Sequence, residues 1–197
     1  MLYRITVRRD IRKSSIKLTH NTHKSTIQLA DEHTIPIGYF DNINDKVFVD
    51  SIKKINSDLI VLAGAPLITQ AVIEVPKIGV LNSHPGILPQ AKGMDVVSQS
   101  ILKNIPLGVT VFKVDEGMDS GDYIIKNELQ ENNLRGMKLH EIEALVEDLS
   151  AKAMLEAIEI IEAGNFHFTK QESGGNVFSA LTYSKYLRVK KHLKKIR

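Results

Sequence analysis

The sequence predicts an α/β fold with a mainly parallel sheet and helices on both of its faces. Residues 58–64 and 78–81 are short, continuous apolar runs, the pattern of strands that are buried on both sides. Stretches with helical spacing alternate with these runs, and such alternation is typical of parallel sheets. A chain of 197 residues is long enough to bury one sizeable core of this kind.

The expected helices follow from apolar spacing and from caps. The first covers residues 22–33, with Thr22 or Ser25 as its N-cap. The longest covers residues 137–163, where apolar side chains recur on one stripe and Gly164 stands at the C-cap position. Three shorter helices are predicted at residues 46–55, 67–75 and 95–103.

Three further segments read as extended chain. Residues 108–114 and 123–129 are predicted strands, and the pattern of residues 2–7 also permits a strand. Residues 35–37 are expected to be extended, because a residue before proline avoids the helical region.

Charge is unevenly distributed along a chain whose net charge is only +3. Residues 185–197 contain seven Lys or Arg and no acid, and the first 21 residues are also basic. The plain interpretation is a solvated, frayed terminus, although basic ends can contact nucleic acid, membrane lipid or phosphorylated ligands. We see no aromatic interleaving of the kind that stacks bases, so nucleic acid is not an expected partner.

Several features are absent from the sequence. It has no cysteine, which excludes disulfides and thiolate metal sites and fits a reducing cytoplasm. No apolar run approaches the roughly 20 residues of a membrane span, and the first residues lack a signal peptide. His20 and His23 have no acids nearby, so we predict no metal site. We expect a cytoplasmic protein without a membrane span.

Candidate catalytic side chains follow from the rule that ligands bind at the carboxyl ends of strands in such sheets. Asn82 and His84 are two residues apart, so in an extended segment they point to the same side. An amide can donate to a developing oxyanion, and an imidazole can act as acid, base or electrostatic stabiliser. Asp119 lies between Gly117 and Gly121 in a loop that can bend back, where its carboxylate can raise the pKa of His84.

Four elements, in this order, resemble the folate-dependent formyltransferases. Residues 58–64 are similar to the strand that leads to the folate pocket, and residues 82–93 (Asn-Ser-His-Pro-Gly-Ile-Leu-Pro-Gln-Ala-Lys-Gly) to the family signature. Residues 108–112 resemble its Gly-Val-Thr strand, and residues 115–125 its Asp-x-Gly-x-Asp-x-Gly element. The resemblance implies a Rossmann-like formyltransferase fold. Since the first 21 residues lack the family's Gly-containing loop, its N-terminal unit is expected to be abbreviated.

The resemblance also implies roles for individual residues. Asn82 would bind the formyl oxygen of 10-formyltetrahydrofolate, protonated His84 would stabilise the oxyanion, and Asp119 would keep His84 charged. The implied folate pocket consists of Ala65, Pro66, Leu67, Ile68, Leu81, Val114, Asp115 and Met118. Alternatively, the apolar residues among these belong to the hydrophobic core and do not contact folate. The implied organisation is a basic N-terminal segment (residues 1–21), a catalytic domain (22–170) and a basic C-terminal tail (171–197).

The resemblance implies that the acceptor is a small, phosphorylated amine. The preferred candidate is an amino-sugar nucleotide, and the second candidate is glycinamide ribonucleotide. Methionyl-tRNA formyltransferases carry an additional C-terminal domain, for which too few residues follow the long helix. A 10-formyltetrahydrofolate hydrolase and a non-catalytic folate-binding relative remain open, as does a homodimer.

Overall fold

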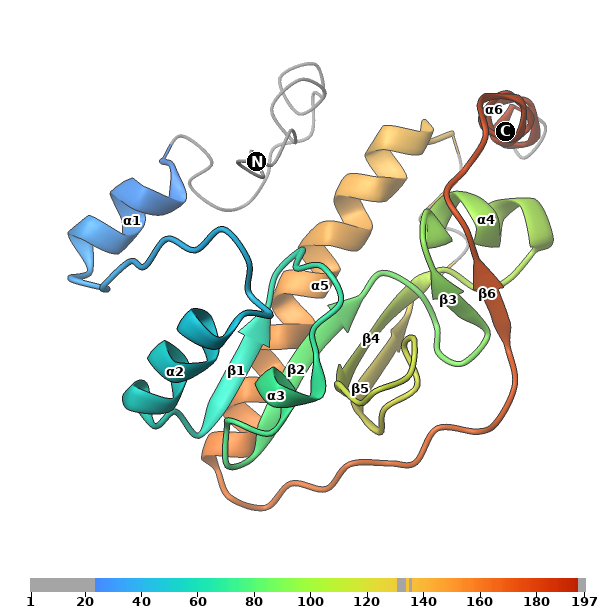
Figure 1. Cartoon of the computed structure of the whole chain (residues 1–197). Coiled ribbons are helices and arrows are strands. Elements are labelled where there is room, and N and C mark those ends of the chain that lie inside the picture. Colours follow the sequence, from blue (N-terminus) through green and yellow to red (C-terminus); the bar gives the residue numbers. More distant parts are fainter. Residues whose placement is uncertain (1–23, 131–133, 135, 195–197) are drawn as a thin grey trace.

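The computed structural model describes residues 24–130, 134 and 136–194. The predicted strand at residues 2–7, the cap at Thr22 and the two histidines at 20 and 23 lie outside these residues. In chain order the elements are α1 (Thr26–Glu32), α2 (Lys46–Ile55), β1 (Leu59–Leu62), α3 (Gln70–Ile73), β2 (Gly79–His84), β3 (Ala91–Gly93), α4 (Val96–Lys103), β4 (Gly108–Lys113), β5 (Tyr123–Glu128), α5 (Leu139–Glu162), β6 (Asn176–Phe178) and α6 (Tyr183–Leu193) (Figure 1).

A four-stranded sheet of order β1-β2-β4-β5 forms the centre of the molecule. β1 and β2 are parallel, whereas β4 runs antiparallel to both β2 and β5. The α/β class is therefore confirmed, but the described sheet is mixed where we expected a mainly parallel one. The link from β4 to β5, residues 114–122, is too short for the helical crossover that parallel neighbours need.

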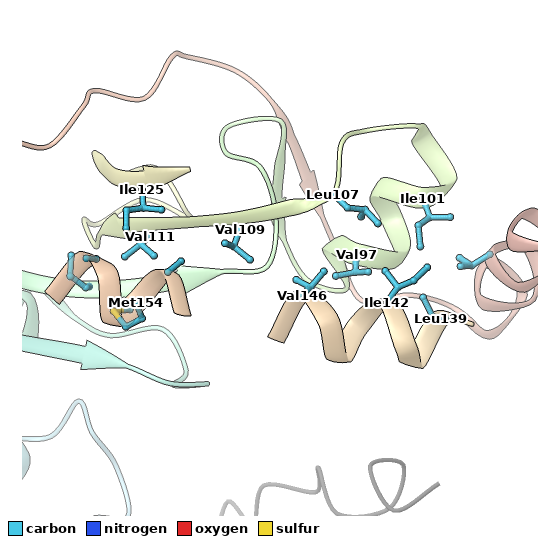
Figure 2. Close-up of a cluster of buried hydrophobic side chains, with 14 of the residues drawn as sticks. Val97, Ile101, Leu107, Val109, Val111, Ile125, Leu139, Ile142, Val146 and Met154 are labelled. Carbon is cyan, nitrogen blue, oxygen red and sulfur yellow. The ribbon is translucent and has the colours of Figure 1, made fainter. Parts of the chain in front are cut away.

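Alternation along the strands assigns each side chain to a face of the sheet. Leu59 packs into the main core, which joins β2 and β4 to one side of α5, whereas Ile60 packs against α2 and α3. Figure 2 shows this main core, with Val109 and Val111 of β4 on one side and Ile142 and Val146 of α5 nearby. Helices therefore cover both faces, as predicted.

β1 differs from the expectation of a strand buried on both sides. It lies at the edge of the described sheet, and Val61 is 41% exposed. An apolar run indicates a strand, but it does not indicate how many other strands pair with it.

Most of the predicted helix ends lie within one or two residues of the observed ends. α2 matches the predicted residues, and Ser25 caps α1 in a capping box with Gln28. Gly164, with φ of +79°, follows the end of α5. α3 is shorter than expected and begins only after Thr69.

The C-terminal region is more ordered than the sequence indicates. β6 pairs in parallel with β3, and neither short strand was predicted. α6 packs through its fully buried Val189, so the expectation of a frayed terminus is wrong for residues 183–193. Across the described part of the chain, no helix has the length and apolarity to cross a membrane.

Candidate active site

Asn82 and His84 lie on the face of the sheet that α5 leaves uncovered. Between them Ser83 points the other way, and its hydroxyl donates to the carbonyl of Ser150 in α5 at 3.2 Å. Since side chains alternate along β2, Asn82 and His84 share the opposite face, with Phe112 and Thr110 as their neighbours on β4. The predicted convergence of the amide and the imidazole on one side is thus present.

His84 is almost completely buried, with 4% of its surface exposed. Its Nε2 lies 2.8 Å from the carbonyl oxygen of Ala91. A carbonyl can only accept, so Nε2 carries a proton. Nδ1 faces Oδ2 of Asp119 at 3.6 Å, which is too long for a hydrogen bond and short enough for an ion pair when the ring is charged.

Burial governs the protonation of His84. Removal of the ring from water lowers its pKa, and this effect exceeds the opposite effects of the Asp119 charge and the Ala91 carbonyl. The charge of Asp119 acts in the expected direction and raises the pKa of His84, but burial outweighs it, so the net pKa lies below the usual value and does not favour the charged ring that the resemblance implies. A pKa below the ordinary histidine value favours the neutral ring near pH 7, and in that form the unprotonated Nδ1 faces the carboxylate.

Asp119 is held by contacts that its own loop does not provide. Its φ is +49°, a left-handed conformation that Asp tolerates better than most residues. Oδ2 accepts the backbone N–H of Gly93 at 2.8 Å. The buried amide of Gln171 donates to the carbonyls of Asp119, at 3.2 Å, and Gly121. Sequence reasoning missed Gln171, which belongs to no motif.

A hydroxyl from β4 fixes the turn that follows His84. Thr110 is fully buried, and its Oγ1 donates to the carbonyl of Gly86 at 2.8 Å. The same oxygen accepts the N–H of Leu88 at 3.1 Å. Gly86 leaves no room for a side chain, since an added Cβ would lie 3.1 Å from Nε2 of His84.

Asn82 has the freedom that a binding residue needs. It is only partly buried, and its side chain has no hydrogen-bond partner among the residues described. The amide is therefore available to a bound oxygen.

The residues of the implied folate pocket divide into three groups. Ala65, Pro66 and Leu67 form an exposed loop after β1, and Leu67 is 77% exposed. Met118, 45% exposed, lies in the loop that carries Asp119. Leu81 faces the opposite way, into the core against α5, so for this residue the alternative of plain core holds.

The remaining pocket candidates have structural partners of their own. Ile68 packs against the cluster of α2 and α3. The N–H of Val114 donates to Val80, and the carboxylate of Asp115 accepts from Gly117 and Ser120 within its loop.

Neither a metal site nor a cavity adds to the candidate residues in the described part of the chain. Within residues 24–194, as far as they are described, no three His, Asp or Glu side chains are grouped to hold a metal ion. A cavity of about 360 Å³ lies between the end of α4, the end of β5 and α6, and it includes none of the candidate residues.

Comparisons with known proteins identify a family for the chain. Residues 16–158 match the model of the formyl transferase family. The methionyl-tRNA formyltransferase of Clostridioides difficile is 33% identical over 141 residues, which are 70% of this chain and 45% of that protein. That of Rickettsia prowazekii is 30% identical, over 77% of this chain and 50% of the relative. The chain thus spans about half the length of these curated relatives.

Solved structures show the same fold. The formyltransferase PseJ from Anoxybacillus kamchatkensis, solved with UDP-4,6-dideoxy-4-formamido-L-AltNAc and tetrahydrofolate, superposes with a TM-score of 0.67 at 23% identity, over 84% of this chain and 87% of PseJ. Phosphoribosylglycinamide formyltransferase from Streptococcus pneumoniae gives 0.61 at 19% identity, over 69% and 79% of the two chains. The family match over more than half of the residues, together with this fold, shows that the chain belongs to the formyl transferase family.

Proposed function

We propose that this chain transfers a formyl group from 10-formyltetrahydrofolate to the primary amine of a small substrate. Our first candidate for this substrate is an amino-sugar nucleotide. The observation that carries the proposal is the convergence of three groups at β2. An uncommitted amide (Asn82) shares a face with a buried imidazole (His84), whose second nitrogen faces a carboxylate (Asp119). These are an oxyanion donor, a base and a group that stabilises the protonated base.

The described residues fit a folate near this site. Leu67 and Met118 are large apolar side chains left exposed in the two loops that adjoin the site, where they offer contacts to an aromatic ring system. Backbone groups after Val114 offer hydrogen bonds to its polar edge. When bound, 10-formyltetrahydrofolate supplies the formyl carbon that the amine attacks.

We infer a distinct part for each side chain. Asn82 donates its N–H to the formyl oxygen, where negative charge develops during attack. His84 is neutral at rest, so its Nδ1 takes the proton that the attacking amine loses. The ring can return this proton to the folate nitrogen as the bond from that nitrogen to the formyl carbon breaks and tetrahydrofolate leaves. Asp119 then lies 3.6 Å from a charged imidazolium and stabilises it. Nε2 stays bound to Ala91 throughout, which keeps the ring in one orientation.

The choice of acceptor rests on the share of each relative that the chain covers. PseJ, whose structure holds a formamido sugar nucleotide, is covered over 87% of its length. Glycinamide ribonucleotide is the second candidate, because the chain covers 79% of the Streptococcus pneumoniae enzyme. Methionyl-tRNA is the third: the relative from Clostridioides difficile is 33% identical, but the chain covers only 45% of it.

The test mixes the purified full chain with 10-formyltetrahydrofolate and each acceptor in turn, and follows tetrahydrofolate release. We expect release that requires an amine, fastest with a UDP-linked 4-amino sugar. His84→Ala should abolish it, whereas His33→Ala, an exposed histidine next to α1, should not. Equal release without any amine would instead establish a hydrolase. No release with any acceptor would refute the proposal.

A further inference from the structure

The cavity between α4, β5 and α6 lies apart from the candidate active site. Its volume of about 360 Å³ is within the range of sites that hold small molecules. It is bordered by the last turn of α4, the link from α4 to β4, the end of β5 and the end of α6. Asn82, His84 and Asp119 are not among the residues that line it. The cavity is therefore a second place where a small molecule can bind.

Most of the cavity wall is apolar. Ile101, Leu107 and Ile142 are buried residues of the main core, and Figure 2 labels all three. The other apolar residues of the wall are Ile105, Pro106, Leu129, Leu134 and Leu193. Such a wall favours a ligand with a hydrocarbon or aromatic body, because binding removes apolar surface from water.

Polar side chains without partners of their own border this apolar space. Four of them make no side-chain hydrogen bond or ion pair with the described residues: Asn104, Glu128, Gln130 and His192. Ser100 lies in the same wall, and its buried hydroxyl also has no partner within the described part of the chain. A few polar groups around an apolar cavity are typical of ligand sites, where they fix the orientation of the ligand.

The charges at the cavity wall favour a positively charged ligand. Among the lining residues that the structure describes, Glu128 is the one with a carboxylate, and none is Lys or Arg. The last turn of α4 adds the partial negative charge of a helix C-terminus. The basic residue of that turn, Lys103, lies over the Phe178 ring, with its Nζ 5.6 Å from the ring centroid.

Groups that would favour a negatively charged ligand are less well placed. Lys191 and Lys194 are exposed near the end of α6, and neither lines the cavity. The first turn of α5 borders the cavity, but there Glu141 Oε2 already accepts the N–H of Lys138 at 2.7 Å. His192 can donate or accept a hydrogen bond, so it does not decide the charge of the ligand.

We propose that this cavity binds a small organic cation, an arylalkylamine in its simplest form. The aromatic body lies against Ile101, Leu107 and Ile142, and the ammonium group pairs with Glu128. The amide oxygen of Gln130 accepts a further N–H of the ammonium group. This binding goes beyond formyl transfer and uses none of its residues, so either proposal can fail without the other.

The experiment titrates 1-naphthylmethylamine into the full-length chain with 13C-labelled isoleucine methyl groups and follows the methyl signals by NMR. We expect saturable shifts for Ile101, Ile105 and Ile142, which line the cavity, and none for Ile52 and Ile60, which pack beside α2. The dissociation constant should be about 1 mM or lower. 1-Naphthalenemethanol and 1-naphthoate have the same ring system without the positive charge, and each should bind about tenfold more weakly or less tightly still.

Two variants test the part of the carboxylate. Glu128→Gln should weaken binding of the amine about tenfold and leave binding of the alcohol unchanged. Glu156→Gln, a matched change at an exposed glutamate of α5, should alter neither. Because the probe is itself an amine, the titration is repeated with Asn82→Ala, which should bind it as the wild type does. Circular dichroism shows whether each variant is folded.

Four outcomes would overturn the proposal. One is the absence of shifts at the cavity isoleucines up to the solubility limit of the amine. The second is binding of 1-naphthoate as tight as that of the amine, which would mean that the cavity prefers anions. The third is unchanged binding of the amine by Glu128→Gln. The last is loss of binding in Asn82→Ala, which would place the probe at the catalytic site.

Discussion

His84 has two ring nitrogens with different partners, and this difference determines what the ring can do. The Ala91 carbonyl occupies Nε2, so only Nδ1 can exchange a proton, beside Asp119. Burial lowers the pKa of the ring, and a neutral ring can act as a base at neutral pH. The residue that a motif marks as catalytic thus obtains its properties from the backbone around it.

The pH dependence of the reaction follows from this shift. kcat/KM should rise with pH through a midpoint below the ordinary histidine value of about 6.5, because the base must be neutral. Asp119→Asn removes a charge that raises the pKa, so its midpoint should move lower still, and its plateau should fall about 100-fold. A wild-type midpoint above the ordinary value would contradict the assignment.

The same shift affects stability. The unfolded chain binds a proton on His84 at a higher pH than the folded chain does. The free energy of unfolding should therefore fall as the pH drops below about 6.5, until the folded pKa is reached. In a chain with His84→Ala, urea unfolding curves should show a weaker dependence over this window.

Gly86→Ala tests whether the Ala91 contact matters. The new Cβ would lie 2.9 Å from the Ala91 oxygen and 3.1 Å from Nε2, so one of the two must move. We expect kcat to fall about 100-fold as the ring loses its orientation, with a stability cost of about 1–3 kcal/mol. Gly38→Ala, whose Cβ meets only the end of the Phe40 side chain, is the control. Equal activities of the two variants would show that the contact between His84 and the Ala91 carbonyl does not contribute to the reaction.

At this scale the sequence predicts side chains better than backbone groups. The two-residue spacing of Asn82 and His84 places them on one face, because side chains alternate in any strand. The Ala91 carbonyl and the Gly93 N–H depend on how a turn folds back onto β2, and residue identity does not encode that.

Among the elements, the extended segment after α5 supports the loop that carries Asp119. Gln171 lies in this segment, far along the chain from Asp119, and its amide binds two carbonyls of the loop. Gln99 offers a matched comparison, since it is also buried and donates to a backbone carbonyl, that of Ser179.

Gln171→Met should therefore lower kcat with little change in KM, since the loop that holds Asp119 loses two bonds. Gln99→Met should lose similar stability, about 1–3 kcal/mol, but retain its kcat. Steady-state kinetics and urea unfolding of both variants make the comparison. If both lose kcat equally, Gln171 is structural only.

α5 supports the sheet through one stripe of side chains (Figure 2). Ile142, near the start of the helix, is fully buried in this stripe, whereas Leu155 on the same helix is 57% exposed. Ile142→Ala should lower the free energy of unfolding by about 2–5 kcal/mol, and Leu155→Ala by less than about 0.5 kcal/mol. Urea denaturation measures both. Comparable losses would mean that the stripe has been assigned to the wrong face.

Elements with a strong period are the ones that the sequence predicts well. Apolar residues recur at helical spacing in α5 and α2, so the ends of these helices can be predicted from the sequence. β3 and β6 are too short to show any period. α6 has one buried residue, Val189, and therefore no stripe to read.

For the whole molecule, the order of the motifs predicts the family but not the pairing of the strands. The alternation of strands and helices correctly indicates an α/β fold with helices on both faces. The antiparallel direction of β4 and β5 arises from short connections, and local patterns do not report strand direction.

The central claim is that a formyl group passes to an amine at the site formed by Asn82, His84 and Asp119. The most direct measurement follows 13C-formyl-labelled 10-formyltetrahydrofolate by NMR, with a UDP-linked 4-amino sugar present. The account predicts that the label appears in a formamide product, at a rate reduced about 100- to 1,000-fold in Asn82→Ala and more in His84→Ala. Label found only in formate, or an unchanged rate in both variants, would contradict it.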